Sequence, residues 1–497
     1  MGSEAAPDLE AHPGRAFGSN NGEQPEGLSD TRVAGRVVVP LGSDDEVNAS
    51  PQSGIRVLFN KFIWHGGSVY DAWLNASSAQ VGQVILTMPT SYAQMGFTYG
   101  VIFQTFYTIL GAWTCYLLAR LYVEYRHRKE KEGHDFKKHV IQYHEVIANL
   151  VAPWARYIVL FFNIMTIGSV ATVQIIACAS NAYYLSDHLN KQQWALIFGA
   201  ISMFMVLVPT LHNFRVFSLV GILTTTYTAW YMFSASLKHG QVGVVQHSAP
   251  NNIQQFFTGT TNILFSTGGH AVTIEIMHAM WSPRKYKYVY IFTCLYVLTI
   301  TMPHCVATYW AFGDVLLTHG NAFSVFPPST ARTLGLVFMI THQAVAFGLY
   351  VMPLFFMWEK LWGIHTAWFP LRVVMRLPVA ALLWFLALAF PFFGPFNSIV
   401  GAIFISFSTF IFPCIAFIYV FWTPQARQNA AEKTSKFLPR GKAMLLTNVA
   451  VVAIIAALGT GLGGYASIYN IVKQINTFGL FDKCYQCAAA APKKRLF

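Results

Sequence analysis

The sequence predicts an all-α integral membrane protein, and two observations lead to this fold class. Hydrophobic residues make up 54% of the 497 residues and charged residues only 11%, which is too little charge for the surface of a soluble protein. The apolar residues also fall in runs of about twenty, the length that a helix needs to cross a bilayer. The short alternating segments that indicate a membrane-spanning β-barrel do not occur.

The apolar runs predict about eleven membrane-spanning helices and divide the chain into segments. The expected spans are residues 77–98, 100–125, 154–183, 192–210, 214–236, 254–280, 287–312, 332–358, 374–391, 396–422 and 443–465. We expect residues 1–61 to be a disordered cytoplasmic tail, 62–76 to be a segment lying on the membrane before the first span, and 466–497 to be an extracellular tail.

The positions of Lys and Arg predict the orientation. Basic residues cluster in the loops at 126–138, 284–287, 360–376 and 427–442, which all lie on one side of the membrane. Cytoplasmic loops carry this excess, so the N-terminus is expected inside and the C-terminus outside. The formal charge of +12 is therefore explained by topology, and nucleic-acid binding is not expected. Asn48 and Asn75 begin N-x-S sequons that we expect to remain unglycosylated, because neither is predicted to face the exterior.

Cys484 and Cys487 form a C-x-x-C pair near the C-terminus. A zinc site needs two further ligands close by, and the sequence offers none. A disulfide and two free thiols are both compatible with this spacing.

Two helices contain residues that interrupt helical structure. Pro89, followed by Thr90, Ser91 and Tyr92, is expected to break the first span, and Gly268-Gly269 before His270 is expected to break the sixth. If residues 77–236 and 254–422 are two five-span repeats, both breaks occupy the same place. Five is an odd number, so the repeats would be inverted. Paired interruptions of this kind indicate a transporter binding site, although a kink repaired by neighbouring helices is the alternative for a single proline.

Half-helix N-termini at such breaks present free N–H groups and the positive end of a helix dipole. The backbone at Thr90–Tyr92 and at Gly268–His270 is therefore expected to hold a carboxylate.

The third span is expected to supply another wall of the site. Asn163, Gln174 and Asn181 fall within roughly 20° of one another around a helix, with Thr166 nearby. Such a polar stripe faces protein or water rather than lipid. Substrate contact and hydrogen bonding between helices are both open for each residue.

Ionisable residues inside the membrane are costly and therefore indicate function. His270 lies at the second break, and a histidine near its ordinary pKa can load and release a proton between an acidic exterior and a neutral cytosol. A neutral histidine that donates one hydrogen bond is the alternative. Glu275 and His278 follow within two turns and are expected to form a relay or an ion pair, not a metal site. Asp187, Asp314, His304 and His342 are lesser candidates.

Several stretches resemble a known family. They include WHGGSVYDAW (64–73), LYVEYRHRKEKEG (121–133), IIACASNAYYLSDHL (175–189), GGHAVTIEIMHAMW (268–281), YWAFGD (309–314) and NTFGLFDKCYQC (476–487). These are similar to the plant auxin influx carriers of the amino acid/auxin permease family, over about residues 60–490. The chain departs from that pattern at Thr90, where an aromatic residue is expected directly after Pro89.

The resemblance implies a leucine-transporter-like fold of two inverted five-helix repeats plus an eleventh span. It also implies proton-coupled import of indole-3-acetic acid across the plasma membrane, with His270 and Asp187 at the family's important histidine and acidic positions. Tyr92, Phe265 and Tyr350 are expected to help hold the indole ring. The expected partners are an indole carboxylate, protons and the lipid bilayer, with no cofactor and no enzymatic activity.

Two alternatives remain at this point. A proton/amino-acid symporter would need a place for an α-amino group, and a non-transporting auxin-binding membrane receptor would bind the ligand without moving it.

Overall fold

The structure is a computed structural model that describes residues 67–134, 136, 140–208, 214–435 and 438–487. Every regular element within these ranges is helical, and none of them is a strand. The expectations for residues 1–61, including the Asn48 sequon, and for residues 62–66 and 488–497 lie outside the described part of the chain.

Eight of the described helical segments are long and apolar enough to cross a membrane. These segments are α4 (Phe97–Lys131), α6 (Ala155–Leu185), α8 (Phe214–His239), α11 (Tyr286–Phe312), α12 (Thr330–Leu361), α13 (Phe369–Ala389), α14–η7–α15 (Phe393–Val400, Gly401–Ile411, Phe412–Val420) and α17–η8–α18 (Lys442–Ile454, Ile455–Leu462, Gly463–Phe478). A shorter apolar helix, α7 with η2 (Lys191–Met203, Phe204–Leu207), corresponds to the fourth expected span.

The first span consists of two half-helices, α2 (Val69–Val81) and α3 (Val84–Met95). Ser68 caps α2 by accepting from the backbone N–H of Asp71, while the Asp71 carboxylate accepts from the Ser68 N–H. The helix thus begins at Val69, eight residues before the start expected for the first span.

The interruption of this span lies at Gly82–Gln83, and the predicted break at Pro89 is wrong. Pro89 is inside α3 and buried. A proline leaves the carbonyl four residues earlier without its helical donor, which here is the carbonyl of Ile85. The His304 ring repairs that loss, because its Nε2 lies 3.1 Å from the Ile85 oxygen. The helix therefore continues through the proline.

The sixth span is broken where the sequence predicts. α9 (Ile253–Phe265) ends before a turn, and the chain continues as the 3₁₀ helix η3 (Gly268–Val272) and then α10 (Thr273–Ala279). Gly268 permits a close approach to the tenth span, since a Cβ there would lie 2.5 Å from Ile405 Cδ1. The glycine pair thus interrupts the helix and lets η7 pack against the break.

The last span is longer than expected. It continues to Phe478, so the tail predicted from residue 466 is helical over its first part. Tyr465, Tyr469 and Lys473 occupy its exposed face, while Ala466 and Ser467 are buried against the rest of the protein. One further short helix, α5 (Tyr143–Val151), lies between the second and third spans and was not expected.

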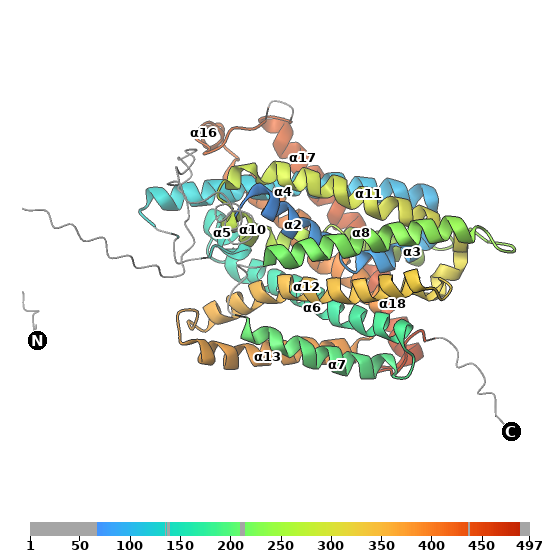
Figure 1. The fold of residues 1–497 in the computed structure, drawn as a ribbon. Coiled ribbons are helices and arrows are strands. Elements are labelled where there is room, and N and C mark those ends of the chain that lie inside the picture. The colour runs from blue at the N-terminus through green and yellow to red at the C-terminus, as the bar shows by residue number, and fades with distance from the viewer. Residues whose placement is uncertain (1–66, 135, 137–139, 209–213, 436–437, 488–497) are drawn as a thin grey trace, which may run out of the picture. The chain divides into compact units, whose positions relative to one another are not determined.

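The helices pack so that the two broken spans lie side by side among the long helices. α3 packs against α9, and α2 packs against α8 and α11. α6 and α12 form an extensive contact next to them, and α13 pairs with α7 (Figure 1). The broken helices are therefore enclosed by protein, as irregular backbone within a bilayer requires.

Candidate functional site

The two breaks border one cavity. Its lining comes from the end of α2, the start of α3, the end of α9, the second break, α6 and α12. The lining residues are Ala79, Gln80, Gln83, Val84, Val170, Phe265, Ser266, Gly268, Gly269 and Tyr350. We call this space the break cavity.

The break cavity combines polar groups with flat apolar walls. α3 begins at Val84, so the positive end of its dipole lies at the cavity, and of its first-turn N–H groups that of Leu86 donates to the Gln83 carbonyl at 3.0 Å. Gln80 adds a buried amide whose Oε1 has no hydrogen-bond partner among the described residues. Phe265 and Tyr350 supply aromatic surface to the lining of the same cavity. The lining thus combines a helix end of the kind that binds anions with aromatic surface of the kind that packs against a flat apolar group.

Two contacts hold the first break in place. Gln174 Nε2 of α6 donates to Gln83 Oε1 at 2.6 Å. The Tyr350 hydroxyl of α12 donates to the Ala79 carbonyl at 2.8 Å, near the last turn of α2. Both half-helices are therefore fixed to the long helices α6 and α12 at their inner ends.

Some predicted binding residues line this cavity and others do not. Phe265, Gly268, Gly269 and Tyr350 do. Thr90, Ser91 and Tyr92 lie farther along α3, so the carboxylate cradle expected at their backbone is wrong, and the free N–H groups belong to the turn that starts at Val84.

The side chains of that α3 segment have other partners. Thr90 donates to the His319 carbonyl at 2.7 Å, Ser91 accepts from Asn262, and the Tyr92 hydroxyl donates to Gln104. Tyr92 thus packs toward α4, and nothing in its contacts makes it a wall of the break cavity.

The sequence analysis missed Gln80, Gln83 and Ser266. The signal was present as Gln-Val-Gly-Gln at residues 80–83, where two amides flank a glycine inside an apolar run. A glycine between buried polar residues is a stronger indication of an opened helix than a proline whose freed carbonyl a neighbour can satisfy.

The polar stripe of α6 is buried, as expected, but its members serve different neighbours. Asn163 contacts the Met357 sulfur, Thr166 hydrogen-bonds Ser408 at 3.1 Å, and Asn181 accepts from Asn321 at 2.8 Å. These residues are spread over eighteen positions, about 27 Å of helix at 1.5 Å per residue. Of the stripe, Gln174 is the member that reaches the first break.

His270 is fully buried, and its ring points away from the break cavity. Its Nε2 lies 3.0 Å from the Thr114 hydroxyl and 3.1 Å from the Gly111 carbonyl, and its Nδ1 lies 3.4 Å from the Tyr290 hydroxyl. The backbone of η3 borders the cavity while the ring joins the second break to α4 and α11. His270 is thus placed to link events at the break to the packing of two long helices.

Glu275 and His278 lie one to two turns beyond the break in α10. Both are buried, and His278 Nδ1 lies 3.3 Å from the Tyr122 hydroxyl of α4. Neither carboxylate oxygen of Glu275 has a hydrogen-bond partner among the described residues, so the structure shows no hydrogen bond between Glu275 and His278.

Asp187 is exposed in the turn after α6, and none of the contacts described for His270 or Glu275 includes it. Among the residues that the structure covers, no three His, Cys, Asp or Glu side chains come together as metal ligands do.

A second cavity lies beside the C-terminal segment, and we call it the loop-side cavity. It is lined by Thr87, Thr90, Gln94, Thr258, Asn262, Leu317, Gly320, Gly394, Pro395, Ser398, Asn470, Gln474, Tyr485 and Gln486. Thr87 is three residues from Val84, and Asn262 is three residues from Phe265. The two cavities are therefore separated by about one helical turn along both half-helices.

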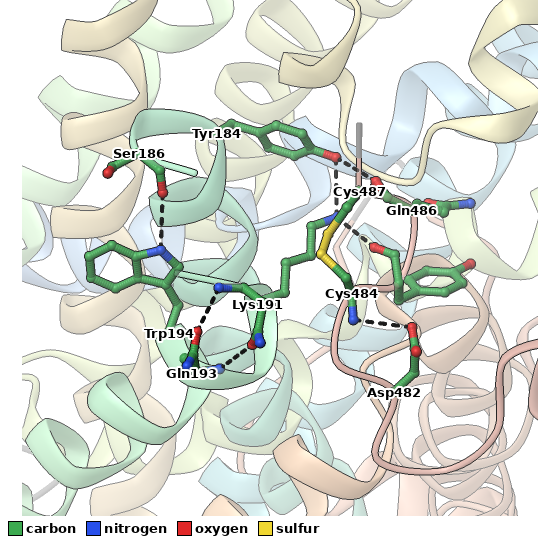
Figure 2. Close-up of a disulfide and its surroundings, with 11 residues drawn as sticks. Tyr184, Ser186, Lys191, Gln193, Trp194, Asp482, Cys484, Gln486 and Cys487 are labelled. Atoms are coloured by element: carbon green, nitrogen blue, oxygen red, sulfur yellow. Dashed lines mark hydrogen bonds between the residues drawn. A yellow bond between two sulfur atoms is a disulfide. The ribbon is translucent and has the colours of Figure 1, made fainter. Parts of the chain in front are cut away.

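The C-terminal segment 479–487 forms one wall of the loop-side cavity and is held by several groups. Cys484 and Cys487 form a disulfide, which decides between the two readings of this pair (Figure 2). The buried Lys191 Nζ donates to the carbonyls of Tyr485 at 2.7 Å and Gln486 at 3.1 Å, and to the Tyr184 hydroxyl at 3.2 Å. Burial raises the pKa of the Tyr485 phenol, which keeps this side chain neutral.

Comparison with known proteins identifies the family. Residues 65–474 match the family described as transmembrane amino acid transporter protein. The chain belongs to this family.

Several curated plant proteins are similar to this chain over most of its length. It is 51% identical over 450 residues to auxin transporter-like protein 1 of Medicago truncatula, covering 90% of this chain and 93% of the relative. It is 51% identical over 433 residues to auxin transporter protein 1 of Arabidopsis thaliana, covering 87% and 89%. Rice auxin transporter-like protein 2 is 51% identical over 460 residues, covering 92% and 95%.

Solved structures confirm the leucine-transporter-like fold. A complex of MhsT with L-phenylalanine has a TM-score of 0.56 at 11% identity, covering 79% of this chain and 98% of that chain. An Eremococcus coleocola manganese transporter mutant has a TM-score of 0.52 at 11% identity, covering 88% and 99%. The protein is therefore a multi-span membrane protein of this transporter fold, with the interrupted helices at the first and sixth spans.

Proposed function

We propose that this protein is a proton-coupled symporter that imports auxin, indole-3-acetic acid, across the plasma membrane by alternating access. The observation that carries the proposal is the break cavity, because its lining combines a helix N-terminus with aromatic side chains. The carboxylate of an indole acid would lie at the start of α3, and its ring against Phe265 and Tyr350. Identity of about 50% to auxin transporters over most of the chain supports this choice of substrate.

The orientation follows from the charge distribution. The N-terminus would be cytoplasmic and the C-terminal segment 479–487 extracellular. The loop-side cavity would then be the way in from the outside, closed at its inner end by one turn of α3 and α9. In alternating access, α3 and α9 would separate on the extracellular side to admit the substrate. A path from the break cavity to the cytoplasm would open afterwards.

Proton coupling gives the buried histidine a role. Moving an anion into a cell opposes the membrane potential by about 2.3 kcal/mol per charge for each 100 mV, and a co-transported proton offsets that cost. We propose that His270 carries this proton, with Asp187 as an outer acceptor and Glu275 as an inner one. The hydroxyls of Thr114 and Tyr290 can each donate or accept, so they can serve both protonation states of the His270 ring. No cofactor is proposed.

Uptake of radiolabelled indole-3-acetic acid in oocytes tests the proposal. We expect saturable uptake that is stronger at about pH 5.5 than at about pH 7.5, where less histidine is protonated. His270→Ala should abolish most uptake and flatten its pH dependence while surface expression stays normal. Absence of saturable, acid-stimulated uptake by the wild type would rule the function out. Binding without flux in proteoliposomes would instead indicate a receptor.

A proton/amino-acid symporter is the second candidate, and one observation favours it. The unpartnered Oε1 of Gln80 lies at the break cavity and is an acceptor that an α-ammonium group would satisfy. Competition by tryptophan against indole-3-acetic acid separates the two functions. Gln80→Leu should lower transport of an amino acid much more than uptake of auxin, because only the amino acid carries an ammonium group that Oε1 can accept from.

A further inference from the structure

The carbonyl of Ile85 is the one that Pro89 leaves without a helical donor. In an uninterrupted helix the N–H of residue 89 would donate to it, but proline has no N–H. Here the Nε2 of His304, 219 residues away in α11, lies 3.1 Å from that oxygen. The ring thus takes the place of a backbone donor in the half-helix α3.

The other ring nitrogen of His304 also contacts a carbonyl. Its Nδ1 lies 2.8 Å from the oxygen of Ile300, one turn earlier in α11. Carbonyl oxygens only accept hydrogen bonds, and a neutral imidazole has a single N–H. A neutral ring would therefore leave one nitrogen lone pair facing an oxygen lone pair, whereas a doubly protonated ring donates to both carbonyls.

His304 differs in this respect from His342, another buried histidine. His342 contacts one carbonyl, that of Gly221, through Nδ1, and its Nε2 has no partner among the described residues. His270 also interacts with two backbone carbonyls, those of Gly111 and Thr267, but the hydroxyls of Thr114 and Tyr290 lie beside its nitrogens as well. A hydroxyl can therefore donate to either nitrogen of a neutral His270 ring, whereas the side-chain donor beside His304 is the weak Cys305 thiol, 3.5 Å from Nε2.

No described charged side chain neutralises a proton on this ring. The titratable groups nearest to it are the Cys305 thiol, 3.5 Å from Nε2, and Tyr92 of α3. The acidic groups of α2, α4 and η5 (Gly313–Thr318), which pack against α11, have other partners. These are Asp71 with Arg215, Glu124 with Arg128, Glu130 with Arg126, and Asp314 with Ser248. The basic His239 of α8 stacks on Phe312, two turns farther along α11.

We propose that His304 is a proton-binding site that fastens the half-helix α3 to α11 while the proton is bound. A buried imidazolium is costly, so the ring holds its second proton only while both carbonyls are in place. Loss of the proton removes one of the two hydrogen bonds and weakens the link between α3 and α11. The site deepens the proposed proton coupling, on which its role in transport rests, by tying protonation to the position of the first break.

Nuclear magnetic resonance of ¹⁵N-histidine-labelled protein in nanodiscs tests the protonation directly. One imidazole signal, assigned by its absence in His304→Gln, should show two protonated nitrogens at about pH 5.5. Pro89→Ala restores a backbone N–H for the Ile85 carbonyl, so the ring loses an acceptor. Its titration midpoint should then move to lower pH by about one unit or more. A single protonated nitrogen from about pH 5 to about pH 8, or a midpoint unchanged in Pro89→Ala, would overturn the proposal.

Transport measurements then test the coupling. Glutamine at position 304 can still donate one hydrogen bond but cannot titrate, so His304→Gln should keep uptake while its stimulation by acid falls about twofold or more. His342→Gln is the matched control, a buried histidine with one carbonyl partner, and should keep the wild-type pH profile. A His304→Gln profile equal to wild type would overturn the coupling role. If the wild-type protein shows no uptake but His304 still titrates, the proposed transport function is wrong and the proton-binding site is retained.

Discussion

Asn262 of α9 donates a hydrogen bond of 2.6 Å to the Ser91 hydroxyl of α3. Both residues lie on the side of the loop-side cavity, and the break cavity begins three residues farther along α9, at Phe265. The bond therefore ties the two half-helices together beside the loop-side cavity. In the proposed transport cycle it must break whenever the substrate passes.

Replacing Ser91 by Ala should weaken this closure. A hydrogen bond of this kind contributes about 0.5–1.5 kcal/mol, so the open form should become roughly two- to tenfold more populated. Labelling of a cysteine placed at Thr87, which lines the loop-side cavity, should accelerate accordingly. Thr447→Ala, which removes a hydroxyl bonded only within its own exposed helix turn, should leave the rate unchanged. If the cysteine is labelled at the same rate in Ser91→Ala and in the control, the Asn262–Ser91 bond does not hold α3 and α9 together.

The Gln83–Gln174 pair should be energetically coupled. Removing either amide leaves the other buried without its partner, which costs about 1–3 kcal/mol. The single Ala variants should each lower thermal stability and substrate affinity, and the double variant should lose less than the sum of the two. Thermal unfolding and binding of the labelled acid across a double-mutant cycle measure this. Strict additivity would mean that the contact does not hold the first break.

Glu359→Gln should severely destabilise the protein. Glu359 accepts from Arg376 at 2.6 Å and from Arg372 at 2.8 Å, and the side chains of Glu359 and Arg376 are fully buried. Removing one member of such a pair leaves an uncompensated buried charge and costs about 3–5 kcal/mol. Thermal unfolding in detergent should show a much lower melting temperature than for the wild type. Glu132→Gln, which breaks an exposed pair with Lys129, serves as the comparison and should melt at the wild-type temperature.

Lys191→Met should release the C-terminal segment. Lys191 supplies donors to two carbonyls of residues 485 and 486, and methionine supplies none. Amide exchange over residues 479–487 should rise at least several-fold, because the segment loses two hydrogen bonds. Lys483→Met is the matched control in the same segment, with an exposed side chain. If exchange rises equally in both variants, Lys191 is not the anchor. Reduction of the Cys484–Cys487 disulfide combined with Lys191→Met should increase exchange further.

Sequence alone located the second break and misplaced the first. Gly268-Gly269 weakens helical structure by its own conformational freedom, so its effect can be read locally. The effect of Pro89 depends on whether another group satisfies the carbonyl that it frees, and the group that does so is His304, 219 residues away. The opening occurs instead at Gly82, where Gln174 of α6 stabilises the adjacent Gln83.

The positions of the predicted binding residues also depended on contacts that the sequence does not reveal. Hydropathy identified the third span and the buried face of α6, but a shared face does not mean a shared ligand. Asn163 and Asn181 are fully buried yet serve Met357 and Asn321 at opposite ends of the helix. Phe265 and Tyr350 were predicted because aromatic rings suit an indole, and the structure places both at one cavity.

By itself, then, the sequence determined the membrane class, the sixth-span break and the family. These properties depend on composition, on runs of apolar residues and on residues adjacent in the chain. The tertiary structure decided where the first helix opens, which way the His270 ring points and where the last span ends. Each of these depends on partners distant in sequence, because a buried polar group in a bilayer takes its position from whichever neighbour can satisfy its hydrogen bonds.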